Sequence, residues 1–373
     1  MTRRNPTSFV SLLFTLLSLL LCFSAFMVFN SAKKTDTAEA TIKAKSTYSI
    51  NYTNLYTNHF FGAFSVDTPA EAAAAASDGI QYTIHYGFPH NTTSAQGLAL
   101  QKAGMKEYAS QILDFLSDYE CHRALINNHT DYCTTEPSSH LTSEAAVLGA
   151  VRNYLQQVRN DPLIIGQWIL DDWPEWDYGS AKQLLIGIHQ LVRQYTPKIP
   201  TICGLGAFFD VKGDVNWHDG IASNFSPQAC DEVGLYIYAA AADNTPNPPK
   251  SDDYDWSMSK VLPQIASSLQ TRGWDKNKTP WIGIGQAFGG TRASNTKVIN
   301  ITPSAKNMTT QALSFCKAGA KDVLWYAYDQ GTYYVPGTGQ TPMNNLNIKQ
   351  GIRSGIAACK AWWGSLAQRS LHR

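Results

Sequence analysis

The sequence predicts an α/β protein built on a single (β/α)8 barrel, and three observations predict it. Short apolar or aromatic runs recur along the chain, each followed by a polar turn and a helical pattern, which is typical of parallel strands with crossover helices. Eight such runs occur, and eight strands close a barrel whose interior side chains can fill. The 373 residues exceed the roughly 250 that such a barrel needs, which leaves room for a leader and insertions.

The N-terminus carries an export signal. Arg3 and Arg4 precede an uncharged apolar run, Val10–Phe29. About 20 apolar residues span a bilayer as a helix, and this run exceeds the roughly 7–15-residue core of a cleaved signal peptide. Residues 1–29 are therefore predicted to be a signal peptide or a signal anchor, with the anchor slightly favoured. We expect the folded part to be extracytoplasmic, either secreted or held at a membrane by this helix.

The remaining chain divides into three parts. Residues 30–58 are rich in Thr, Lys, Ala and Asn without periodicity, which predicts a flexible linker. The barrel domain is predicted over 59–365 and a C-terminal tail over 366–373.

The first half of the barrel domain contains four of the predicted strands: Phe60–Val66, Ile80–Tyr86, a run that begins near Met105, and Leu163–Leu170. An Ala-rich helix begins at Thr68-Pro69-Ala70-Glu71, where proline occupies an early helical position. Further helices are predicted over 95–103 and Ser143–Arg159. The third run is ambiguous because MKEYASQILDFL fits either a strand or a helix, and we expect a long loop holding Cys121 and Cys133 after it.

The second half supplies the other four predicted strands: Thr201–Phe209, Glu232–Ala239, Trp281–Phe288 and Val323–Tyr328. The helices predicted around them are Ala181–Tyr195, Ser257–Arg272, Ser304–Gly319 and Asn345–Trp363. The structural alternative is an open, doubly wound sheet. Neither GxGxxG nor GxxxxGK[ST] follows the first strand, which disfavours that alternative.

Six cysteines lie outside the apolar run that holds Cys22, and an even number in an exported chain permits disulfides. Cys121 and Cys133 flank a polar segment, so this bridge is the first expected. By elimination alone the others are Cys203–Cys230 and Cys316–Cys359, and the alternative is that several of these are buried free thiols.

The predicted site lies where the strands end, because active sites of such barrels form at the C-terminal ends of the strands. Carboxylates, aromatic side chains and an amide would converge there, as in a site for a polar, ring-bearing ligand such as a sugar. The residues at these strand ends include Tyr236. The candidates for substrate binding are Asp67, His85, Tyr86, Trp173, Tyr238, Gln286, Trp325 and Tyr326. The catalytic candidates are Asp171, Asp172 and Asp329.

The strongest local feature is the turn Ile169-Leu170-Asp171-Asp172-Trp173-Pro174-Glu175. Two adjacent carboxylates follow a buried strand, and because side chains alternate along a strand, only one of them should face the barrel axis. Burial beside Trp and a second carboxylate favours a proton donor, which predicts Asp171 or Asp172 as general acid. The alternative is structural: one Asp caps the next helix and the other binds a backbone amide or an Arg.

The eight-run layout, this turn, and the runs WIGIGQAFGG and DVLWYAYDQ resemble the glycoside-hydrolase-like TIM-barrel superfamily over roughly Phe60–Trp363. The resemblance implies that Asp171 or Asp172 occupies the general acid/base position. It also implies a nucleophilic Glu after strand seven, where this chain has Gln286. An amide cannot act as a carboxylate nucleophile. Either another carboxylate (Asp329, Asp67 or Glu175) takes that role, or the protein binds carbohydrate without hydrolysing it.

Several functional classes are disfavoured. Beyond residue 34 the chain has 26 basic and 29 acidic residues without a basic stripe, so no nucleic-acid partner is expected. The chain lacks CxxC and HExxH, which argues against a zinc site, and GxSxG, which argues against a serine-hydrolase elbow. No metal and no organic cofactor is predicted, and the expected partners are a carbohydrate and, through residues 1–29, a membrane.

Overall fold

The computed structural model describes the folded part of the chain in several stretches: 59–86, 93–127, 133, 135–171, 181–206, 208–209, 215–216, 225–238, 262–293, 296, 299–329 and 333–371. The expected leader (1–29) and linker (30–58) lie outside the described residues. Within these stretches, no helix combines the length and the apolar character needed to cross a membrane.

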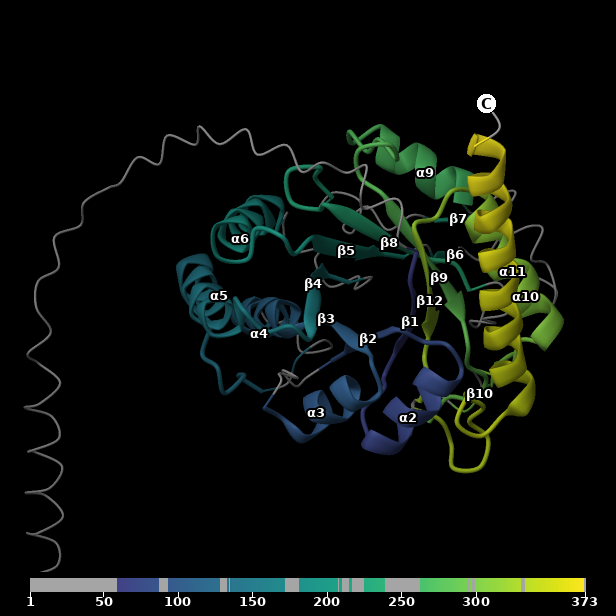
Figure 1. Cartoon of the computed structure of the whole chain (residues 1–373). Helices are drawn as coiled ribbons and strands as arrows, with labels where there is room; N and C mark the ends of the chain where they lie inside the picture. Colours follow the sequence, from purple (N-terminus) through teal and green to yellow (C-terminus); the bar gives the residue numbers. More distant parts are fainter. Residues whose placement is uncertain are drawn as a thin grey trace, which may run out of the picture. The chain divides into compact units, whose positions relative to one another are not determined.

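Eight parallel strands close into a barrel, with the order β1-β12-β9-β8-β5-β4-β3-β2 (Figure 1). The closure is direct, because β1 pairs in parallel with β2 on one side and with β12 on the other. The strands are β1 (Phe61–Phe64), β2 (Tyr82–His85), β3 (Lys106–Ala109), β4 (Ile164–Leu170), β5 (Thr201–Leu205), β8 (Glu232–Tyr236), β9 (Trp281–Gln286) and β12 (Asp322–Tyr326). All eight predicted strands are confirmed, and the open sheet is excluded.

Two small antiparallel sheets are inserted after barrel strands. One joins β6 (Phe208–Phe209) to β7 (Val215–Asn216), and the other joins β10 (Gly290–Thr291) to β11 (Ile299–Asn300). The predicted fifth and seventh strands therefore end earlier than expected, and their last residues belong to connections.

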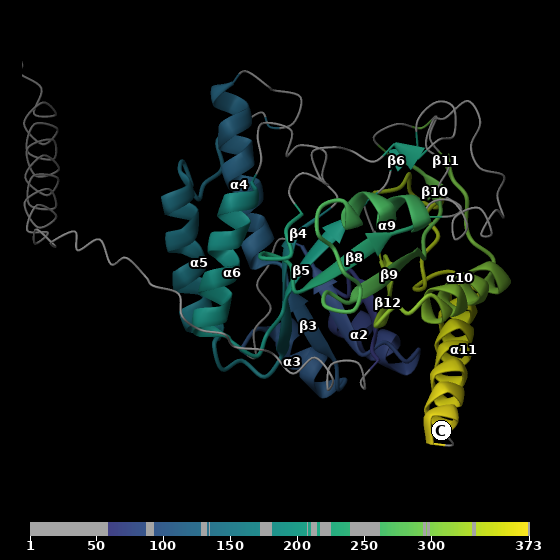
Figure 2. The same ribbon diagram turned by 90° about the horizontal axis from the view of Figure 1, so that it is seen from above.

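Helices surround the barrel (Figures 1 and 2). They are α2 (Pro69–Ser77), α3 (Ala95–Lys102), α4 (Gln111–Ile126), α5 (Glu144–Val158), α6 (Lys182–Tyr195), α9 (Leu262–Gln270), α10 (Ala305–Lys317) and α11 (Leu346–Leu371). Thr68 and Glu71 form a capping box at α2, as the TPAE sequence suggests. The last helix runs past Trp363 into the segment predicted as a tail, because Leu, Ala, Gln and Arg after Gly364 are good helix formers.

The ambiguous run resolves into both elements: Lys106–Ala109 is β3, and α4 begins at Gln111. The expected loop around Cys121 is wrong, because Cys121 lies inside α4. Buried residues recur at helical spacing, Ile112, Leu116, Glu120 and Ala124, so the amphipathic pattern continues through the cysteine to the end of the helix.

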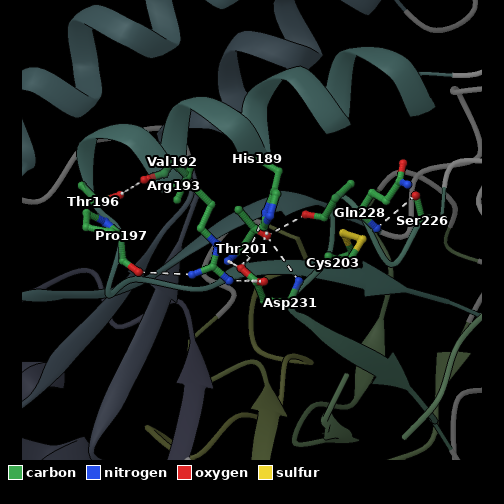
Figure 3. Close-up of polar contacts among 12 residues, drawn as sticks. His189, Val192, Arg193, Thr196, Pro197, Thr201, Cys203, Ser226, Gln228 and Asp231 are labelled. Carbon is green, nitrogen blue, oxygen red and sulfur yellow. Dashed lines mark hydrogen bonds and ion pairs between the residues drawn. A yellow bond between two sulfur atoms is a disulfide. The ribbon is translucent and has the colours of Figure 1, made fainter. Parts of the chain in front are cut away.

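The six cysteines form the three expected pairs, Cys121–Cys133, Cys203–Cys230 and Cys316–Cys359. Beside Cys203–Cys230, Asp231 accepts hydrogen bonds from the Thr201 amide at 2.9 Å and from Arg193 of α6 (Figure 3). His189 Nδ1 lies 3.0 Å from Thr201 Oγ1 in the same group. Disulfide and ion pair together attach α6 and the turn before β8 to β5.

The barrel interior is filled by alternate residues of the strands, and Trp168 is its largest side chain. Two glycines make room for that ring. A Cβ at Gly204 would lie 2.5 Å from Trp168 Cζ2, and one at Gly234 would lie 2.6 Å from Cη2. Because real Cβ atoms do not approach that closely, larger residues at these positions would displace the indole.

Candidate active site

Asp171 follows the last residue of β4 and is 2% exposed, with its carboxylate directed into the barrel mouth. Its Oδ1 accepts a hydrogen bond from Tyr236 Oη at 2.5 Å, and its Oδ2 accepts one from Tyr86 Oη. The three residues stand at the C-terminal ends of β2, β4 and β8, so the site joins strands that are far apart in the sequence. We call the group Tyr86, Asp171, Tyr236, Tyr238 and Tyr326 the mouth.

A β-bulge aims Asp171 inward. Trp168 points into the barrel, so strict alternation would direct Leu170 inward and Asp171 outward. The pairing with β5 shifts register between Trp168 and Leu170. Ile169 and Leu170 both pack in the outer core, which is the apolar layer between the barrel and its helices. An extra residue in a strand re-aims the side chains that follow it. The bulge therefore turns Asp171 toward the axis.

Glycine is also required beneath this carboxylate. A Cβ at Gly204 would lie 2.9 Å from Asp171 Oδ1, besides meeting Trp168. The indole of Trp168 thus forms the floor of the mouth and Gly204 gives Asp171 its space.

The two tyrosines are arranged as hydrogen-bond donors. Burial, and then the charge of Asp171, raise the pKa of the Tyr86 hydroxyl well above its ordinary value of 10.0. The phenol therefore stays protonated at neutral pH and donates to the carboxylate. Hydrogen bonds to the charged form of a carboxyl group favour that form. The Tyr86 and Tyr236 hydroxyls lie 3.4 Å apart, so they hold Asp171 from one side together.

Aromatic rings line the rest of the mouth. The Tyr326 ring lies 5.0 Å from Phe64 and 6.0 Å from Tyr238, centroid to centroid. Phe288 extends this wall, at 5.2 Å from Tyr238 and 5.9 Å from Tyr326. Tyr86, Tyr238 and Tyr326 were predicted near the site, and the structure brings all three together with Asp171. Tyr236 is the site residue missing from the sequence-predicted candidates for substrate binding, and its spacing of two residues from Tyr238 is the signal that could have found it.

Asp67 and His85 form a pair of their own at the ends of β1 and β2. The imidazole Nδ1 of His85 contacts Asp67 Oδ1, and the Asp67 amide donates to Glu71 Oε2 at 2.6 Å. The Asp67 side chain is 42% exposed, so the pair stands at the rim rather than in the core of the mouth.

Gln286 is buried at the end of β9 and its amide binds backbone. Its Nε2 donates to the carbonyls of Phe288 and Ile301, both at 2.9 Å. These contacts attach β9 to the segment before α10. Trp325 points away from the mouth: it packs in the outer core, 6.3 Å from the Phe61 ring and against Gly355 of α11.

Asp329 is half-buried three residues after β12 and lines a cavity of about 350 Å³ with Tyr334, Thr341 and Asn344. No pattern in the sequence pointed to those three residues, which lie in the connection to α11. Asp172 and Trp173 lie outside the described residues. In the part of the chain that the structure describes, no cluster of three metal-ligating side chains occurs.

Neither a protein-family model nor a curated protein matches the sequence. Solved structures do match the fold. The endo-β-1,4-mannanase of Thermotoga petrophila is 9% identical with a TM-score of 0.51, over 82% of this chain and 78% of that one. Active domain 2 of a Pyrococcus furiosus chitinase is 10% identical with a TM-score of 0.52, over 82% and 95%. The endo-1,4-β-mannanase of Rhizomucor miehei is 12% identical with a TM-score of 0.50, over 81% and 95%.

The chain therefore has the TIM-barrel fold, which it shares with these mannanase and chitinase structures. The resemblance inferred from the strand runs is therefore confirmed for the fold. Sequence identities this low say nothing about the reaction or the substrate of this chain.

Proposed function

We propose that this TIM-barrel protein acts on carbohydrate outside the cytosol as a glycoside hydrolase, with Asp171 as its central carboxylate. The observation that carries the proposal is a buried acid at the C-terminal end of β4, held by two tyrosine hydroxyls in a mouth lined with aromatic rings. Rings of this kind stack on the apolar faces of sugars. The three disulfides support an oxidising, extracytoplasmic setting.

The hydrogen bonds favour roles in which Asp171 is ionised. Two hydroxyl donors stabilise its ionised form, which suits a base, a nucleophile or a charge that stabilises an oxocarbenium-like transition state. The proton for the leaving oxygen then comes from another group. Asp172 stays a prediction for that role, because it lies outside the described residues.

Replacing Asp171 with Asn tests the proposal. We expect the release of reducing sugar from a panel containing mannan, chitin and cellulose to fall by about 10²- to 10⁴-fold. Asp118→Asn, on α4 outside the barrel, is the matched control and should retain full activity. Undiminished hydrolysis by the Asp171 variant would remove this residue from the mechanism.

A second candidate is a carbohydrate-binding protein without turnover. Gln286 favours it, because an amide stands where the resemblance implies a nucleophilic carboxylate, and that amide already binds two backbone carbonyls. Binding of oligosaccharides by the wild-type protein with no release of reducing sugar would select this candidate.

A further inference from the structure

We propose that the cavity beside the mouth is a second sugar-binding subsite, which takes one neutral pyranose ring of an oligosaccharide. The proposal rests on the proposed function. We call this cavity the β12–α11 pocket and define it by Asp329, Tyr334, Gly339, Thr341 and Asn344. Its volume of about 350 Å³ lies at the lower end of the roughly 300–1,000 Å³ range of small-molecule sites.

Aromatic rings connect the pocket to the mouth. The Tyr326 ring of the mouth lies 5.9 Å from Phe288, and Phe288 lies 6.5 Å from Tyr334, with the last two rings nearly parallel at 28°. Tyr334 forms a wall of the pocket. One continuous series of packed rings therefore joins the mouth to a wall of the pocket. Phe288 and Tyr334 are themselves buried, so their packing fixes the position of that wall relative to the mouth.

The pocket is built before any ligand arrives. Gly289 and Gln340 exchange backbone hydrogen bonds of 3.0 and 2.8 Å, and the Val335 amide donates to Thr291 O at 2.9 Å. A Cβ at Gly339 would lie 3.1 Å from Tyr334 Cβ, so glycine lets the backbone pass close to that side chain. Because these hydrogen bonds join residues 335–340 to residues 289–291 after β9, binding would require little further ordering of the chain.

Thr341 supplies an unpaired hydroxyl group in the lining of the pocket. The residue is 3% exposed, and its Oγ1 has no hydrogen-bond partner within the described stretches of the chain. An unpaired buried hydroxyl costs free energy, which a ligand hydroxyl would offset. Asn344, by contrast, is already engaged: its Oδ1 accepts from the Thr341 amide at 2.8 Å, and its Nδ2 donates to Gly339 O at 2.9 Å.

The charge of the lining limits the ligand. Among the described residues that line the pocket, Asp329 is the one charged side chain, and neither Lys nor Arg is present. A carboxylate accepts hydrogen bonds from sugar hydroxyls but repels an anionic sugar. The pocket should therefore prefer neutral rings to uronic acids.

Binding is measured by calorimetry in the full chain carrying Asp171→Asn, so that ligands are not turned over. The probes are mannohexaose, chitohexaose and cellohexaose, with hexagalacturonate as the anionic arm. Adding Thr341→Val should weaken binding of the preferred neutral hexasaccharide by about five- to tenfold, the worth of one hydrogen bond. Thr310→Val, at an exposed site on α10, is the matched control and should leave binding unchanged.

Two further readouts separate binding from folding. The thermal midpoint of Thr341→Val should equal or exceed that of its parent, because a methyl group replaces an unpaired buried hydroxyl. Asp329→Asn should narrow the difference in affinity between the neutral hexasaccharide and hexagalacturonate. If a neutral hexasaccharide binds and neither substitution changes any affinity, the pocket proposal fails while the proposed function stands. If none of the probes binds, both fail.

Discussion

The two ends of the barrel interior both bury carboxyl groups but satisfy them differently. At the N-terminal ends of the strands, Lys321 Nζ lies 2.5 Å from Glu232 Oε1 and 3.8 Å from Asp322 Oδ2. Tyr108 donates to Asp322 at 3.3 Å, and the Phe60 amide donates to it at 2.7 Å. At the mouth, Asp171 is held by two tyrosine hydroxyls.

The difference separates a structural network from a site. An ammonium group between two carboxyl groups offsets part of their charge where the barrel is closed and buried. Hydroxyl donors orient Asp171 without cancelling its charge, so that a positive charge developing on a ligand can still be stabilised by it. In the proposed function, the pair of tyrosines orients a carboxylate that acts on a bound ligand.

The N-terminal network should be the more sensitive to loss of a partner. Lys321→Met would leave Glu232 and Asp322 buried without their cation, so we expect the free energy of unfolding to fall by about 3–5 kcal/mol. Denaturant unfolding measures this, with Lys306→Met on the exposed face of α10 as the control. A loss below about 1 kcal/mol would show that the network contributes little to stability.

At the mouth, Tyr236→Phe should affect activity more than folding. Loss of one hydrogen bond to a charged group costs about 1.5–3 kcal/mol, so kcat/KM should fall by roughly 10- to 100-fold. The acidic limb of the pH–rate profile should also move to higher pH, because the ionised carboxylate loses a donor. Tyr195→Phe on α6 is the control. An unchanged profile would mean that Tyr236 does not act through Asp171.

The pH dependence of stability sharpens the same comparison. Burial raises the pKa of Glu232 above its ordinary value of 4.5 although Lys321 opposes the change, and burial also raises the pKa of Asp322. The folded state then holds more protons than the unfolded state above pH 4.5, so these groups make stability fall as pH rises through the raised pKa. A tenfold difference in proton affinity between the folded and unfolded states changes the free energy of unfolding by about 1.4 kcal/mol.

Glu232→Gln should reduce that fall, which urea unfolding between about pH 4 and pH 8 would measure. His189 contributes with the opposite sign: burial lowers its pKa, so its contribution to stability is lost as pH falls below 6.5. The wild type and the Glu232→Gln variant both contain His189, so the difference between their curves of stability against pH isolates the contribution of Glu232. Parallel curves would contradict the raised pKa of Glu232 in the folded state.

The smallest effect expected is that of Asp171→Asn on folding. Asn keeps one acceptor for the tyrosines, and removing a buried charge offsets the loss of the other acceptor, so the free energy of unfolding should change by about 1 kcal/mol or less. Thermal and denaturant unfolding of the inactive variant would test this. A loss as large as that of Lys321→Met would place Asp171 in the same structural class as Glu232.

The strands were predictable because their signals are local: a buried apolar run, a turn residue and a helix start are all read within about a dozen residues. The aim of Asp171 was not, since it depends on a bulge that appears only when β4 pairs with β5. The direction of the Trp325 side chain was equally unpredictable, because alternation along a strand does not say which face is the interior. The position of Cys121 was missed for another reason, since α4 continues through the cysteine where a loop was expected. Glu232 and Lys321 meet across 89 residues, and no pattern in the sequence links them.

In the proposed function, Asp171 is the group that contacts the carbohydrate. A crystal structure of the Asp171→Asn protein soaked with the hexasaccharide it binds tests this most directly. We predict a sugar ring stacked in the mouth, with a glycosidic linkage or ring oxygen within hydrogen-bonding or van der Waals distance of residue 171. A hexasaccharide bound only elsewhere on the surface, with the mouth empty, would contradict the account.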